Sequence, residues 1–237
     1  MKQLQNVSGL VAALALVVIV LITSFEIGIY SDDSWYQREY EKYQVLDDLE
    51  MEMQDVMHVT EEMLAYLRGD RENLEVETVV NKEKRLFFNE REKLHMEDVQ
   101  RLFLGGLKIR RIAGILFIAS LLAVFFLKGN LRKILPQMYG WAVVLFLGGT
   151  AALGGLIAVD FNKYFVLFHK IFFTNDLWLL DPDTDLMIRM LPEGFFFDMV
   201  ARIGGIFITS LLFLWIAGLL WKHVGHKKSH GINNSYK

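Results

Sequence analysis

Two histidines, His95 and His169, are notable because each lies next to an apolar stretch long enough to cross a membrane. On the helix predicted around His95, Glu92 lies three residues before it and Asp98 three residues after it, so either carboxylate can reach its ring. A carboxylate bonded to one ring nitrogen would fix the tautomer and leave the other nitrogen free to take a proton. Two such imidazoles at one face of a membrane predict a site for acid–base chemistry.

Candidate nucleophiles of the protein's own are scarce. The chain has no cysteine, which excludes a disulfide framework, a thiolate zinc site, an iron–sulfur cluster and a cysteine nucleophile. It has no G-x-S-x-G nucleophile elbow, and Ser31 and Ser34 are the only serines in the segments predicted to lie outside the membrane. If acyl transfer takes place here, the sequence favours an attacking group that belongs to the substrate.

A metal site is the alternative chemistry for the same histidines, since imidazole with carboxylate suits zinc or manganese. The acids near His169 that could join it are Asp176, Asp181 and Asp185. Against a metal, no H-x-x-x-H or H-E-x-x-H pair places two ligands on one helix face. The run from Asp181 to Asp185 begins like a calcium loop, but Leu186 stands where the loop needs glycine, so it predicts a turn with a helix cap.

The elements that must position these residues are four membrane spans. Hydrophobic residues make up 53% of the 237 residues and charged residues 22%, and the two kinds separate into blocks along the chain. About 20 apolar residues in a helix cross a bilayer. The first stretch lacks an A-x-A-like cleavage site and is predicted to be a retained anchor. The four predicted spans are Val7–Ile29, Ile112–Leu127 (which Leu102–Leu107 could extend), Met138–Val159 and Met199–Trp221.

Basic residues in the short loops predict cytoplasmic N- and C-termini. The segments are then an anchor (1–30), an outer domain (31–107), the second and third spans (108–159), an outer loop (160–198), the fourth span (199–221) and a cytoplasmic tail (222–237). Both outer segments are acidic, and the net charge of −3 argues against a nucleic-acid binder. Glu26 falls near the outer end of the first span, where a carboxylate is costly, so it is a candidate functional residue.

The outer segments are predicted to be mostly helical. Apolar residues recur at helical spacing from Leu46 to Leu67, and Gly69 is expected to end that helix. A short β-hairpin is predicted to turn at Asn81 and Lys82. Asn89 with Glu92 has the form of a capping box that begins the helix carrying His95. The aromatic run around His169, Tyr164–Phe173, predicts a helix at the lipid headgroup level.

Two groups of motifs resemble the lipoprotein intramolecular transacylase (Lit) family. The resemblance runs from about Tyr40 to the fourth span, and the four-span layout agrees with it. In the outer domain it is carried by Val59–Gly69, Phe88–Glu92 and His95–Val99; in the outer loop by Leu167–Phe173, Asn175–Trp178, Asp181–Asp185 and Met190–Phe196.

The resemblance implies an all-α, multi-pass enzyme of the bacterial cell membrane whose substrate is a diacylglyceryl lipoprotein at the outer leaflet. Such enzymes move the sn-2 acyl chain to the α-amino group of the N-terminal cysteine of the lipoprotein. The reaction needs a base, an oxyanion donor and an acid, and two histidines can share these roles without an enzyme nucleophile or a cofactor. We expect His95 to be the base and His169 the acid or oxyanion donor, or the reverse. Second choices, for polar lining or substrate placement, are Arg91, Asn175, Asp176 and Trp178.

Two other functions stay open at this point. One is a metal-dependent membrane amidase or lipid hydrolase that uses the same histidines. The other is a non-enzymatic membrane sensor or scaffold whose outer domain binds a partner. A transporter is disfavoured, because charged residues are nearly absent from the interiors of the predicted spans.

Overall fold

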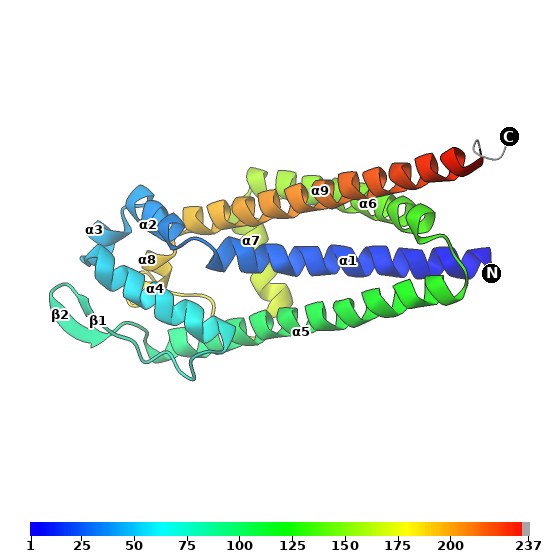
Figure 1. Cartoon of the computed structure of the whole chain (residues 1–237). Helices are drawn as coiled ribbons and strands as arrows, with labels where there is room; N and C mark the ends of the chain where they lie inside the picture. The colour runs from blue at the N-terminus through cyan, green and yellow to red at the C-terminus, as the bar shows by residue number, and fades with distance from the viewer. Residues whose placement is uncertain (234–237) are drawn as a thin grey trace. The chain divides into compact units, whose positions relative to one another are not determined.

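The computed structural model describes residues 1–233, with side chains as far as His223. The chain divides into two compact units, and each is treated by itself below. The first contains residues 1–25, 108–155 and those from 203 onward; the second contains residues 26–107 and 156–202. Figure 1 labels their helices and strands. Most of the predicted cytoplasmic tail (222–237) lies outside the described side chains.

Four helices are long and apolar enough to cross a membrane: α1 (Lys2–Tyr30), α5 (Glu90–Phe126), α6 (Leu131–Val159) and α9 (Glu193–Asn233) (Figure 1). The prediction of four spans is confirmed. Each helix is longer than the span predicted within it, because backbone hydrogen bonding continues past the apolar stretch. In α5 the helix that carries His95 runs without a break into the second predicted span.

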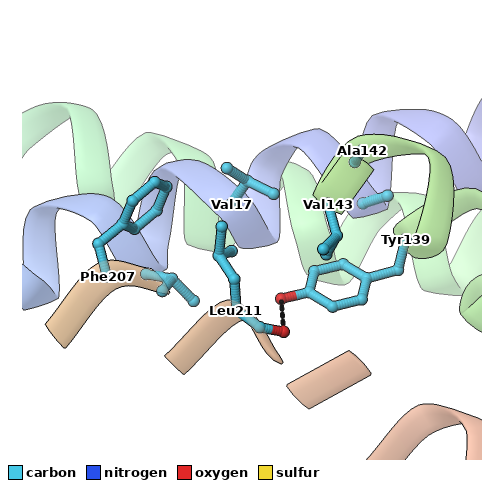
Figure 2. Close-up of a cluster of buried hydrophobic side chains, with 8 residues drawn as sticks. Val17, Tyr139, Ala142, Val143, Phe207 and Leu211 are labelled. Atoms are coloured by element: carbon cyan, nitrogen blue, oxygen red, sulfur yellow. Dashed lines mark hydrogen bonds between the residues drawn. The ribbon is translucent and has the colours of Figure 1, made fainter. Parts of the chain in front are cut away.

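The first unit is held together by a small apolar core between α1, α6 and α9. Figure 2 shows Val17 of α1, Val143 of α6 and Leu211 of α9 meeting there, and each is fully buried. The hydroxyl of Tyr139 donates to the carbonyl oxygen of Leu211 at 3.4 Å, which satisfies a polar group inside this core. Large apolar side chains on the other sides of these helices are exposed, as expected for surfaces that face lipid rather than water.

The second unit contains three helices from the first outer segment: α2 (Asp33–Lys42), α3 (Val45–Leu49) and α4 (Met53–Arg68). The single helix predicted from Leu46 to Leu67 is wrong, because Glu50 takes a left-handed conformation with φ of 52° and separates α3 from α4. The expected end of α4 is confirmed, since Gly69 has φ of 85° at the helix C-terminus.

The predicted hairpin is confirmed as an antiparallel pair, β1 (Glu77–Val80) and β2 (Glu83–Leu86). Asn81 and Lys82 have φ values of 49° and 64°, the backbone conformation of the tight hairpin turn that suits twisted strands. Val80 pairs directly with Glu83 across this turn.

The second outer segment forms α7 (Phe161–Phe172) and α8 (Leu186–Met190). The side chain of Asp160 caps α7 by accepting from the backbone N–H of Lys163 at 3.0 Å. The predicted turn before α8 is present: the carboxylate of Asp185 accepts from the backbone N–H of Asp181 at 2.7 Å. Asp185 is 2% exposed and is the N-cap residue of α8.

The carboxylate of Glu92 joins the two outer segments. The predicted capping box is confirmed: Asn89 Oδ1 accepts from the backbone N–H of Glu92 at 3.0 Å, and Glu92 Oε2 accepts from that of Asn89 at 2.7 Å. The other oxygen, Oε1, accepts from the backbone N–H of Met187 in α8 at 2.6 Å. Glu92 is 0% exposed, so this carboxylate fixes α8 against the first turn of α5.

We predict that Glu92→Gln lowers the free energy of unfolding by about 1–3 kcal/mol, because an amide offers one oxygen to two buried N–H donors. Thermal unfolding of the detergent-solubilised protein measures this. The matched control is Glu90→Gln on the same helical turn, where the side chain is 88% exposed, and it is expected to change stability by less than about 0.5 kcal/mol. Equal melting temperatures for the two variants would contradict the prediction.

Candidate active site

His95 and His169 meet within the second unit. His95 comes from the second turn of α5 and His169 from the last turn of α7. The centroids of their rings are 6.1 Å apart, with 36° between the ring planes. They are 6% and 8% exposed, so the structure brings together in a buried place two residues that are far apart in sequence.

The ring of His169 is oriented by a backbone carbonyl. Its Nδ1 lies 2.7 Å from the carbonyl oxygen of Phe165, one helical turn earlier, and because that oxygen only accepts, Nδ1 carries the proton in this bond. The neutral ring therefore presents Nε2 with its lone pair, the form of a general base. Burial lowers the pKa of His169, and the bond to Phe165 partly opposes this shift.

Aromatic side chains enclose His169. The indole of Trp178 is stacked on it, with 4.9 Å between ring centroids and 29° between planes, and the ring of Phe165 lies 4.2 Å away. Phe173 contacts both histidines, at 5.5 Å from His169 and 5.4 Å from His95. Phe165 and Phe173 belong to the predicted aromatic run, but their contacts with the histidines were not predicted individually.

His95 lies in a less polar setting than the sequence suggested. Its Nδ1 is buried and has no hydrogen-bond partner in the part of the chain that the structure describes. His95 lies before the predicted second span, and burial lowers its pKa to about 4. A positive charge on His169 would lower this pKa further, while Asp98 raises it. At neutral pH the imidazole of His95 is therefore uncharged.

The expected pairing of His95 with a carboxylate is not what the structure has. Both oxygens of Glu92 accept from backbone N–H groups, those of Asn89 and Met187. Asp98 accepts from Arg101 and from Asn175 Nδ2, the latter at 2.7 Å. Asp98 acts on His95 through its charge alone, because the capping box and the outer loop occupy the two carboxylates that sequence spacing placed beside the ring.

The loop that carries Trp178 is held by three of the residues predicted for polar lining or substrate placement: Arg91, Asn175 and Asp176. Arg91, one turn before His95, donates to the backbone carbonyl of Asp176 at 2.6 Å. Asp98, almost one turn after His95, accepts from Asn175 as described above. Asn175 Oδ1 also accepts from the backbone N–H of Leu177 at 3.1 Å, which shapes the turn leading to Trp178. The helix that carries His95 thus fixes the loop whose indole covers His169.

The remaining expectations concern Glu26 and metals. Glu26 is half-buried on α1, close enough to Tyr30 for their charges to interact, and its part in the site stays a prediction. Among the described residues no group of three or more His, Asp or Glu side chains converges as metal ligands would. Of the acids considered for a metal, Asp185 accepts from the backbone N–H of Asp181 and from Asn89 Nδ2, and Asp181 accepts from the backbone N–H of Asp183.

The fold and the site together define an integral membrane protein of four spans with a buried pair of histidines suited to acid–base chemistry. The sequence model of the family described as lipoprotein intramolecular transacylase Lit matches residues 10–196. The chain therefore belongs to the Lit family, a family of acyltransferases.

Solved structures of the Bacillus cereus membrane integral lipoprotein intramolecular transacylase Lit have the same fold. One aligns with a TM-score of 0.78 at 20% identity over 97% of this chain and 100% of that one. A variant of that protein with one histidine replaced by alanine aligns with a TM-score of 0.72 at 19% identity, over 97% of each chain. An uncharacterized protein of Aquifex aeolicus (strain VF5) is 30% identical over 141 residues, which are 60% of this chain and 58% of that protein.

The low pKa of His95 gives a prediction for stability. An unfolded chain protonates this residue near its ordinary pKa of 6.5, and the folded protein only near 4, so the unfolded state binds more protons between these values. The free energy of unfolding therefore falls as pH drops from 6.5 toward 4, by up to about 3 kcal/mol from His95. Melting temperatures in detergent at pH 7 and pH 5 measure the loss.

In His95→Leu the free energy of unfolding is expected to fall less between pH 7 and pH 5, because only His169 and other groups still contribute to the pH dependence. His58→Gln, at an exposed position of α4, is the matched control and is expected to keep the wild-type dependence. A pH dependence in His95→Leu as steep as in wild type would show that His95 is not the group responsible.

Proposed function

We propose that this chain moves the sn-2 acyl chain of a diacylglyceryl lipoprotein to the α-amino group of its N-terminal cysteine, giving the lyso form. The observation that carries the proposal is the buried pair of imidazoles, 6.1 Å apart, in an aromatic enclosure. Family membership gives the reaction class, and the geometry of the pair supports acid–base catalysis of an acyl transfer.

The substrate supplies the nucleophile. No hydroxyl group in the described part of the chain is hydrogen-bonded to either histidine, and the sequence has no cysteine. In a diacylglyceryl lipoprotein the amine and the ester belong to one molecule, so a site that holds them together makes the step unimolecular. Effective molarities of about 10⁵–10⁸ M have been measured for well-oriented groups, which removes the need for an acyl-enzyme.

His169 is the base in this proposal, the reverse of our first assignment, because its Nδ1–H is held by Phe165 and its Nε2 has the free lone pair. Nε2 takes a proton from the α-ammonium group, and the amine nitrogen attacks the ester carbonyl carbon. As the new C–N bond forms and the glyceryl C–O bond breaks, the nitrogen loses a second proton. One of the two protons ends on the glyceryl oxygen and the other leaves to solvent.

His95 is the donor to the oxyanion. Its low pKa keeps it neutral, and a neutral imidazole has one N–H to donate to the negative oxygen of the tetrahedral intermediate. A charge on His169 disfavours a charge on His95, so the pair holds at most one extra proton near neutral pH. This suits a reaction in which one histidine carries the proton while the other stays a neutral donor.

Arg91, Asp98, Asn175 and Asp176 are positioning residues in this proposal, since they hold the loop that places Trp178 on His169. The stacked indole stabilises the imidazolium that forms when His169 takes a proton. The proposal also places both termini in the cytoplasm and the histidine pair at the outer face of a bacterial cell membrane, where membrane lipids surround the spans and lipoproteins carry their acyl chains.

The direct test is mass spectrometry of a lipoprotein N-terminus from bacteria that lack apolipoprotein N-acyltransferase and express this chain. We expect N-acyl, S-monoacylglyceryl cysteine. Persistence of the diacylglyceryl form with a free amine, despite confirmed insertion of the protein in the membrane, would overturn the proposed function. A strain carrying the empty vector is the control.

The two roles are separated by matched variants assayed with purified protein. His169→Ala and His169→Gln are both expected to lose about 10²–10⁴-fold in rate, because neither side chain can take up a proton. His95→Ala is expected to lose about 10²–10³-fold, while His95→Gln recovers part of that loss because its amide still donates an N–H. Recovery by glutamine at position 169 rather than at 95 would reverse the assignment.

A further inference from the structure

A small cavity of about 110 Å³ has in its wall the ring of Phe165, which contacts His169. It is formed by α7, by α8 and by the first turn of α9, all within the second unit. Phe165 belongs both to its wall and to the surroundings of His169. The lining residues are Phe161, Asn162, Phe165, Ile188, Glu193 and Phe196.

Three of these residues are phenylalanines whose rings adjoin one another. The ring centroids of Phe161 and Phe165 are 5.7 Å apart, and those of Phe165 and Phe196 are 5.3 Å apart. The faces of aromatic rings are electron-rich and attract cations, and groups of such rings recognise organic ammonium groups. An apolar cavity of about 150 Å³ takes a benzene molecule, so this one has room for about four or five heavy atoms.

Glu193 adds a negative charge to the cavity. Its carboxylate is exposed, and Oε2 accepts only a long hydrogen bond, 3.5 Å, from Asn162 Nδ2. No Lys or Arg forms an ion pair with it among the described side chains; Arg189 of the neighbouring helix pairs with Asp48, and Lys163 lies over the ring of Tyr164. An acid in the first turn of a helix also offsets the helix dipole, and Glu193 is in the first turn of α9. That role alone does not explain why three phenylalanine rings line the same cavity.

We propose that this cavity, which we call the ammonium cavity, binds an organic ammonium group. Rings, one carboxylate and one amide around a space of this size match the charge, the hydrogen-bonding capacity and the volume of such a group. The α-ammonium group of the lipoprotein substrate is the ligand if the proposed function holds. The headgroup of phosphatidylethanolamine has the same chemistry and is the other source.

The ammonium cavity has a clear use in the proposed reaction. It binds the charged form of the N-terminus next to His169, because Phe165 contacts both the cavity and that histidine. His169 does not line the cavity, so the ammonium group passes from the cavity to His169 Nε2 and loses its proton there. The neutral amine then has no electrostatic attraction back to Glu193 or to the rings, and it attacks the ester beside the histidine pair.

The test measures binding without turnover, using the full-length protein in detergent at pH 6.5 and two diacylglyceryl lipopeptides. In one the α-nitrogen carries two methyl groups, so it is cationic and cannot become a stable amide; in the other it is acetylated and neutral. We expect wild type to bind the cationic lipopeptide about 10-fold more tightly. Glu193→Gln is expected to remove this preference, and Glu193→Asp to keep part of it.

The rings are tested by Phe161→Leu, which keeps an apolar side chain of similar size but removes one π face. The preference for the cationic lipopeptide is expected to fall about 3-fold, with unchanged affinity for the neutral one. The matched control is Phe197→Leu: Phe197 contacts Phe161, with 5.9 Å between ring centroids, but does not line the cavity. Phe197→Leu is expected to keep the wild-type preference.

A parallel experiment compares dihexanoyl phosphatidylethanolamine with dihexanoyl phosphatidylglycerol as competitors for lipopeptide binding. A Glu193-dependent preference for the ethanolamine lipid, without one for the cationic lipopeptide, would support the ammonium cavity and assign it to a lipid headgroup. No Glu193-dependent preference for either cation would overturn the inference. Because both arms measure binding alone, a wild-type protein that discriminates the lipopeptides but forms no N-acyl product would contradict the proposed function and leave this inference supported.

Discussion

The carboxylate of Glu92 joins two backbone N–H groups that lie far apart in the sequence, at Asn89 and Met187, and it does so with no exposure to solvent. A buried carboxylate is costly unless its oxygens are satisfied, and here each oxygen has a backbone donor. The arrangement therefore tolerates little displacement of α8 from the first turn of α5. Since α8 follows the loop that bears Trp178, the enclosure of the histidine pair depends on this group together with the bonds that Arg91 and Asp98 form to the loop.

Burial also determines the chemistry of the pair. Each imidazole loses hydration that would favour its charged form, and the pKa of both is lowered as a result. The hydrogen bond between His169 Nδ1 and a backbone carbonyl then distinguishes the two rings, because it stabilises one tautomer of His169. Nδ1 of His95 has no such partner in the described part of the chain. Two chemically identical side chains thereby acquire different capacities, one for accepting a proton and one for donating a hydrogen bond.

Much of the local structure was predictable because its causes are local. The four spans follow from long apolar stretches, the capping box from Asn89 and Glu92 at the right spacing, and the hairpin from a turn at Asn81 and Lys82. The break at Glu50 was missed, since a non-glycine residue in a left-handed conformation leaves no mark in a pattern of apolar residues. The N–H of Asn81 bonds to the carbonyl of Glu50, a contact that only the folded chain provides.

The sequence by itself determined that the chain has four spans, that no cysteine takes part in its chemistry and that His95 and His169 are the best candidates for a site. It could not determine what surrounds them. Spacing along a helix shows which side chains can meet, and Glu92 and Asp98 were candidates for His95 on that ground. Only the tertiary structure decided that both are bound by groups from elsewhere in the chain, because a carboxylate goes to the donors that burial would otherwise leave unsatisfied.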